Sequence, residues 1–140
     1  MNGDFVDSNV FVYLFDETAL QKHQVARSLI QAGLEEGTVS ISHQVIQETL
    51  NVITRKLPVP ATPDQARRFM DAVLLPLWRI MPSRELYHRA LDIQSRYQYA
   101  LYDALVVAAA LEGGCARLYS EDLQDGQKIE GLVIKNPFER

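Results

Sequence analysis

The chain has 140 residues, of which 47% are hydrophobic and 23% charged, a composition typical of globular proteins that excludes a long disordered tract. It holds a single cysteine, Cys115, so neither an internal disulfide nor a cysteine-based zinc site can form within it. The formal net charge of −4 excludes a uniformly basic surface, but it does not decide about a nucleic-acid partner, because the distribution of lysines and arginines matters more than their total.

The length and the hydropathy predict one domain over residues 1–140, located in the cytoplasm. The length falls within the usual size of a single domain. The N-terminus lacks a basic segment followed by an apolar run, and the longest apolar stretch, residues 104–111, is far too short to span a bilayer. We therefore expect a protein with no membrane segment.

The start of the chain predicts a strand, a helix and a second strand. Residues 5–15 indicate a buried strand that runs into a turn or a short helix, with Asp7 at the carboxyl end of the strand. Apolar residues at helical spacing predict a helix over residues 18–35, with Gly37 as its C-cap. Residues 38–41 then predict a second short strand.

Two further helices are expected before the middle of the chain. Ser42 is expected to N-cap a helix over residues 43–56, in which Glu48 lies on the flank of the apolar stripe. The segment 62–65, Thr-Pro-Asp-Gln, combines a capping box with proline at the first helical position. It predicts a helix that extends to about residue 75.

The second half of the chain continues the alternation of strands and helices. A strand is expected at residues 78–81, a helix after Ser83, an almost wholly apolar helix at 102–112, and strands at 117–120 and 132–135. This order predicts an α/β fold with three layers, α/β/α, around a central, mainly parallel sheet of about five short strands. Ligands of such sheets bind outside the carboxyl ends of the strands.

Four acidic residues stand in otherwise apolar surroundings: Asp7, Glu48, Asp103 and Asp122. Asp103 lies between Leu101-Tyr102 and a run of Ala, Leu and Val, where an unpaired carboxylate would face a desolvation cost of several kcal/mol. Its position in the first turn of a helix offsets only roughly 0.3–1 kcal/mol of that cost. The four acids therefore point to a compensating cation, although a helix-capping role for Asp103 and a turn or salt-bridge role for Asp7 remain open.

A divalent cation would resolve the repulsion within such a cluster. Two carboxylates about 5 Å apart repel each other by roughly 3 kcal/mol at an effective dielectric constant near 20. Mg²⁺ and Mn²⁺ prefer oxygen ligands, and Mg²⁺ usually combines one or two carboxylates with water or phosphate oxygens. We therefore expect Mg²⁺ or Mn²⁺ as the cofactor, at a site suited to phosphodiester chemistry.

The acids and their flanking residues resemble the four motifs of the PIN domain family. The segments are Phe5 to Val10, Glu48 in its helix, Tyr102 to Leu105 at the start of the apolar helix, and Ser120 to Asp122 after a strand. They match in order, residue type and spacing over nearly the whole chain. The resemblance implies a PIN-like fold, with Asp7, Glu48, Asp103 and Asp122 as the catalytic and metal-binding acids.

The resemblance also implies roles for three polar residues near these acids. Asn9 and Ser120 would support the acidic site as polar neighbours. Asp125 would either contact residues that surround the acids, without binding the metal itself, or serve only as a turn residue before Gly126. None of the acidic positions departs from the family pattern, so the sequence gives no indication of an inactive enzyme.

The C-terminal third is similar to VapC-type toxins within this family. The similarity lies in residues 118–126, 129–132 and 136–138. It implies a magnesium-dependent endoribonuclease, the toxin of a toxin–antitoxin pair, held inactive by a cognate antitoxin protein and commonly a homodimer. By the same analogy, the antitoxin surface would include the helices around residues 19–30 and 64–75.

Substrate RNA would require basic residues outside the acidic cluster. Six are available for such a surface: Arg55, Lys56, Arg67, Arg68, Arg79 and Arg84. Without the four clustered acids, the rest of the chain is close to neutral, so charge alone neither supports nor excludes RNA.

Two other function classes compete with a ribonuclease. A catalytically silent PIN-like binding or scaffold module would share the fold, but a structural role would not require the four acids. A phosphoaspartate phosphatase or receiver-type protein also places acids at strand ends. However, the phosphatase pattern expects a second Asp at position 9, where this chain has Asn9, and the receiver pattern does not fit well either.

Overall fold

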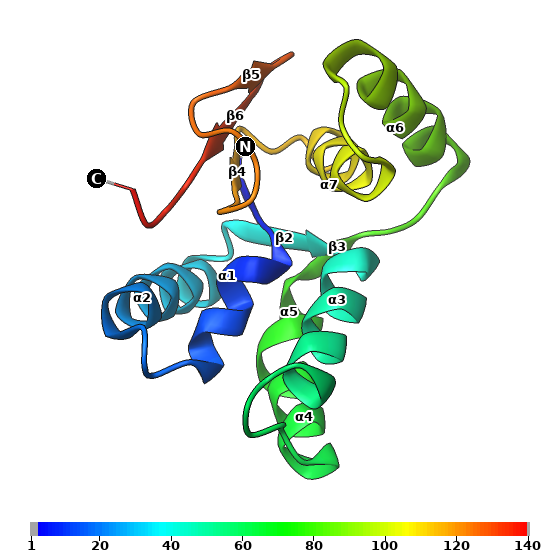
Figure 1. Ribbon diagram of the computed structural model, residues 1–140. Coiled ribbons are helices and arrows are strands. Elements are labelled where there is room, and N and C mark those ends of the chain that lie inside the picture. Colours follow the sequence, from blue (N-terminus) through cyan, green and yellow to red (C-terminus); the bar gives the residue numbers. More distant parts are fainter. Residues whose placement is uncertain (1–2, 140) are drawn as a thin grey trace.

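The computed structural model describes residues 3–139 and is built around a six-stranded sheet (Figure 1). The strand order is β3-β2-β1-β4-β6-β5, and all neighbouring strands are parallel except β5 and β6. The strands are β1 (Asp4–Val6), β2 (Val39–Ser42), β3 (Trp78–Ile80), β4 (Arg117–Tyr119), β5 (Lys128–Ile129) and β6 (Leu132–Lys135).

The helices cover the sheet and fill the connections between parallel strands. They are α1 (Ser8–Val12), α2 (Leu20–Glu36), α3 (His43–Arg55), α4 (Pro63–Phe69), α5 (Leu75–Leu77), α6 (Arg84–Tyr97) and α7 (Leu101–Glu112). A 3₁₀ turn, η1 (Tyr13–Phe15), follows α1, and a π-helical segment, η2 (Met70–Leu74), joins α4 to α5. In Figure 1, α6 and α7 lie together on one side of the strands, and α1 and α2 lie on the other. The α/β/α fold expected from the sequence is therefore confirmed.

The centre of the sheet is held by a row of buried apolar side chains. Phe5 on β1 pairs with Leu118 on β4, and Leu118 pairs in turn with Ile134 on β6; all three are fully buried. One residue before Phe5, Asp4 accepts hydrogen bonds from Nε and Nη2 of Arg117 across the same strand pair, at 2.9 and 3.2 Å. This pairing fixes the register of β1 against β4, so Val6 lies beside Tyr119 where both strands end.

The structure corrects two details of the sequence expectations. The sheet has six strands rather than about five, because the short strand β5 pairs antiparallel with β6. Ser42 occupies the N-cap position of α3, but its side chain makes no capping hydrogen bond, and its buried Oγ has no partner within residues 3–139. In the same range, no helix is both long and apolar enough to cross a membrane.

Gly33 lets α2 pack directly against β2. A Cβ atom at this position would lie 2.3 Å from Cγ2 of Val39, a distance that atoms do not adopt. The missing side chain is therefore required by packing, although glycine in a helix interior costs about 1 kcal/mol relative to alanine.

We predict that Gly33→Ala lowers the free energy of unfolding by about 1–3 kcal/mol, because the added methyl group forces α2 away from the sheet. Denaturant titration measures the change. Ser28→Ala, on the exposed side of the same helix, is the matched control and should change the free energy of unfolding by less than about 0.5 kcal/mol. A Gly33→Ala protein as stable as the wild type would contradict the packing argument.

Candidate active site

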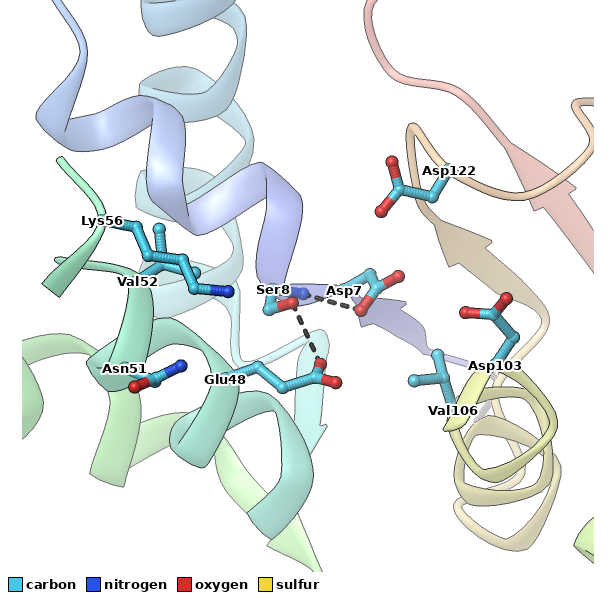
Figure 2. A pocket seen from close by; sticks show the side chains of 9 residues that line it. All are labelled: Asp7, Ser8, Glu48, Asn51, Val52, Lys56, Asp103, Val106 and Asp122. Atoms are coloured by element: carbon cyan, nitrogen blue, oxygen red, sulfur yellow. Dashed lines mark hydrogen bonds between the residues drawn. The ribbon is translucent and has the colours of Figure 1, made fainter. Parts of the chain in front are cut away.

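The four acids predicted from the sequence line one cavity of about 350 Å³ (Figure 2). Asp7 and Asp122 come from the segments after β1 and β4, Glu48 from α3, and Asp103 from the first turn of α7. The complete lining consists of Asp7, Ser8, Glu48, Asn51, Val52, Lys56, Asp103, Val106 and Asp122. The parallel pairing of β1 with β4 thus brings together residues that are more than one hundred positions apart in the chain.

Asp7 is the innermost of the four acids, with 6% of its surface exposed. Its backbone N–H donates to the carbonyl of Tyr119 at 2.9 Å, which continues the β1–β4 ladder one residue beyond the strand. Its Oδ1 accepts from the N–H of Ser8 at 2.8 Å, so the carboxylate also caps α1. The position of this carboxylate is therefore set by backbone on both sides.

Asn9 and Ser120 join Asp7 to Asp122. The Oγ of Ser120 donates to Oδ2 of Asp7 at 2.9 Å and accepts from the N–H of Asp122 at 3.2 Å. The Nδ2 of Asn9 lies within hydrogen-bond distance of Oδ2 of Asp7 and Oδ2 of Asp122, at 3.2 and 3.1 Å. Both side chains therefore contact the acids in the way expected of polar supports.

Glu48 is held from two sides. Its Oε1 accepts from the hydroxyl of Ser8 at 3.1 Å (Figure 2). Its Oε2 accepts from Nε2 of Gln44, one turn earlier on α3, at 3.2 Å, and the same Nε2 donates to the carbonyl of Tyr102 at 3.0 Å. Asp103 differs from the other acids, since no residue within 3–139 forms a hydrogen bond with its carboxylate. Its oxygens remain available for a ligand.

Burial and mutual repulsion raise the pKa values of two of the acids. Burial raises the pKa of Asp7 to about 6; hydrogen bonds from Ser120 and Ser8 lower it, and the charges of Glu48 and Asp122 raise it further. Burial is also the main cause of the raised pKa of Asp103, and the charge of Asp122 adds to it. The cavity therefore holds carboxylates for which a nearby positive charge would be favourable.

The donor set fits a hard divalent cation. All four acidic side chains offer carboxylate oxygens, the ligand type that Mg²⁺ and Mn²⁺ prefer over nitrogen or sulfur. The acids are spread around the cavity, and no three Asp, Glu, His or Cys side chains among the described residues lie close enough together to form a ready-made metal cluster. The fit therefore rests on the chemistry of the four donors and on the burial of Asp7 among them.

Asp125 lies apart from the other predicted site residues. It is not among the residues that line the cavity, and its Oδ1 accepts from the backbone N–H of Asn136 at 2.8 Å. That contact ties the loop after β4 to the chain after β6. This hydrogen bond does not reach any of the four acids.

The six basic residues expected at a substrate surface are dispersed. Lys56 lines the cavity. Arg67 and Arg68 both pair with Asp64, and Arg79 donates to the backbone carbonyls of Gly37 and Val39. These three arginines are therefore engaged in contacts outside the acidic cavity.

Sequence reasoning did not assign Ser8 and Gln44 to the site. Gln44 stands four residues before Glu48, a spacing that places both side chains on the same face of a helix and could have identified it. Ser8 was visible only as the neighbour of Asp7. Its contact with Glu48 depends on how α1 packs against α3.

Comparison with known proteins gives one family match and two informative structural neighbours. The sequence profile of the PIN domain matches residues 5–125. One solved structure, a chain of a toxin–antitoxin complex from Klebsiella pneumoniae, is 20% identical with a TM-score of 0.72, and the match covers 99% of this chain and 100% of that one.

The second neighbour is VapC20 of Mycobacterium tuberculosis, described as a toxin that cleaves the sarcin-ricin loop. It is 20% identical with a TM-score of 0.62, and the match covers 86% of this chain and 90% of that one. At such identities the two structures show a shared fold. No curated protein sequence matches the chain significantly.

The raised pKa of Asp7 predicts that Asp7→Asn stabilises the metal-free protein at neutral pH. The ionised carboxylate is disfavoured in the fold, and a shift from 3.8 to about 6 corresponds to about 1.4 kcal/mol per pKa unit. Replacement by Asn should therefore raise the free energy of unfolding in EDTA by about 1–3 kcal/mol near pH 7.5.

The stabilisation by Asp7→Asn depends on pH, because it arises from the ionisation of Asp7 in the wild type. Between about pH 4 and pH 6 the native wild type binds a proton that the unfolded chain has released, so its free energy of unfolding falls as the pH rises. The advantage of Asp7→Asn should shrink toward zero near pH 4. Urea titrations of both proteins across this range test the prediction, and a pH-independent difference would contradict it.

Proposed function

The chain belongs to the PIN domain family, and from this premise we propose that it is a metal-dependent endoribonuclease that hydrolyses RNA phosphodiester bonds. The observation that carries the proposal is the convergence of Asp7, Glu48, Asp103 and Asp122 on one cavity at the carboxyl ends of β1 and β4. The toxin–antitoxin and VapC structures that share its fold support the same chemistry.

The four acids would hold Mg²⁺ or Mn²⁺, which when bound supplies positive charge against the phosphate oxygens of the substrate. Asp7 and Glu48 are the fixed members, because each uses both carboxylate oxygens in hydrogen bonds to the surrounding protein. These hydrogen bonds orient the lone pairs that remain.

Asp103 is suited to accept the proton of the attacking water. Its carboxylate makes no hydrogen bond to the rest of the described chain, so an oxygen is free to accept a hydrogen bond, and then the proton, from that water. Asp122 lies on the same side of the cavity as Asp103 in Figure 2. The apolar side chain of Val106 lies beside Asp103 and helps to exclude bulk water.

We further propose that the chain acts as one domain over residues 1–140, in the cytoplasm, as the toxin of a toxin–antitoxin pair with a cognate antitoxin protein as its partner. The Klebsiella pneumoniae neighbour comes from such a complex. A homodimer is part of the same proposal. Exposed apolar side chains on α6, Tyr87 at 50% and Leu91 at 57%, support a protein contact on that helix.

The proposal predicts that the purified protein cleaves RNA in Mg²⁺ or Mn²⁺ and not in EDTA. Asp7→Asn and Asp103→Asn should each reduce the cleavage rate by about 100-fold or more, because both acids act at the reacting phosphate. Gel analysis of a mixture of structured RNAs measures the rates. Asp71→Asn removes an exposed acid outside the cavity and should cleave like the wild type.

Melting curves separate an enzyme from a silent binding module. Mg²⁺ or Mn²⁺ should raise the melting temperature of the wild type, and the increase should be smaller for Asp7→Asn. A folded wild type that binds the metal but leaves every RNA intact would favour the catalytically silent alternative. Undiminished cleavage by both Asn variants would refute the site assignment.

A further inference from the structure

Lys56 is the one basic side chain among the residues that line the acidic cavity. It stands directly after α3, where its backbone N–H donates to the carbonyl of Val52 at 2.8 Å. In Figure 2 its side chain extends toward Ser8, on the opposite side of the cavity from Asp103 and Asp122. A cation is thus present at one end of a cavity that is otherwise acidic or uncharged.

The charge of Lys56 is not used within the described chain. Six of the lysines and arginines among residues 3–139 are paired with acids, for example Lys22 with Glu121 and Arg117 with Asp4, and Lys56 is among those that are not. Lys56 has no carboxylate oxygen within 4.0 Å among residues 3–139, although four carboxylates line the same cavity. Its ammonium group therefore remains available to an anion that enters the cavity.

A cation is also favourable at the C-terminal end of a helix, because it offsets the partial negative charge of the last carbonyls. Arg55, in the last turn of α3, already supplies this charge and does not line the cavity. The helix end therefore does not explain why the second cation extends into the cavity.

Asn51 lies on α3 between Glu48 and the helix end at Lys56, and it lines the same cavity. Its side-chain amide can donate a hydrogen bond to an anion held by Lys56. In Figure 2, both side chains lie on the α3 side of the cavity, away from Asp103. The two residues offer a point charge and a hydrogen-bond donor, a combination suited to a phosphate group.

We propose that Lys56 and Asn51 form a phosphate-binding subsite, which holds an RNA phosphate next to the scissile one. The proposal rests on the ribonuclease function proposed above and adds a direction to it, with the RNA strand running along α3 from the four acids toward Lys56. The metal held by the four acids would meet the scissile phosphate, and Lys56 supplies a separate positive charge for the phosphate next to it.

The test measures binding and cleavage separately. Binding of a labelled single-stranded RNA is followed by fluorescence anisotropy over a series of salt concentrations, in the Asp7→Asn background, so that cleavage is slow compared with the measurement. Lys56→Met should weaken binding about tenfold at low salt. A plot of the logarithm of the RNA-binding constant against the logarithm of the salt concentration has a negative slope. Lys56→Met should make this slope shallower by about 0.7, the contribution of one single-strand phosphate contact. In the otherwise wild-type enzyme, KM should rise about tenfold while kcat changes less than about twofold.

Two control variants make the outcome specific. Arg55→Met removes the neighbouring cation that lies outside the cavity, and it should leave the salt slope and KM close to those of the wild type. Lys56→Arg keeps the charge and should restore the salt slope. Equal losses in Arg55→Met and Lys56→Met would overturn the subsite in favour of unspecific attraction, as would an unchanged slope and KM in Lys56→Met.

The subsite and the ribonuclease function can fail independently. Metal-dependent cleavage with an unaffected Lys56→Met variant would refute the subsite and leave the function standing. If the wild type binds RNA with the predicted dependence on Lys56 but cleaves none, the ribonuclease function fails, and the subsite stands as an RNA-binding feature. A wild type that neither binds nor cleaves RNA would overturn both.

Discussion

The candidate site depends on the pairing of β1 with β4. The register is set by the apolar contact between Phe5 and Leu118 and by the hydrogen bonds from Arg117 to Asp4, both within the sheet. Parallel strands end at the same edge, so the residues after Val6 and after Tyr119 must meet there. Asp7 extends the ladder by one further hydrogen bond, and Ser120 and Asn9 then connect it to Asp122. A slip of one residue would turn Asp7 away from the cavity.

This arrangement concentrates carboxylates where the protein cannot easily solvate them. Burial of Asp7 and repulsion from its acidic neighbours act against its ionised form. The hydrogen bonds from Ser8, Asn9 and Ser120 reduce this cost but do not remove it. An electrostatic cost of this kind is common at functional sites, where a protein loses some stability in order to hold its ligand-binding groups in place.

The sequence was sufficient to predict most of the fold and all four acids of the cavity. Asp7, Glu48, Asp103 and Asp122 stand out because each interrupts or borders an apolar segment, and their contexts match the family motifs. The strand β5 was missed because it has two residues, and because the β5–β6 hairpin turns through Glu130 and Gly131 instead of the Asn-Gly or Asp-Gly pair typical of such turns. Sequence patterns also could not predict the partners of the basic residues, because tertiary packing decides what surrounds Arg79 and Lys56.

The order of the strands also has a consequence for synthesis. Asp7 leaves the ribosome more than one hundred residues before its partners Ser120 and Asp122. No earlier strand can substitute for β4, because β1 has β2 on its other side. A nascent chain that has released Asp7 therefore carries an incomplete acidic cavity until β4 and the residues after it have been made, and a cell that makes this protein meets the assembled centre only after that point.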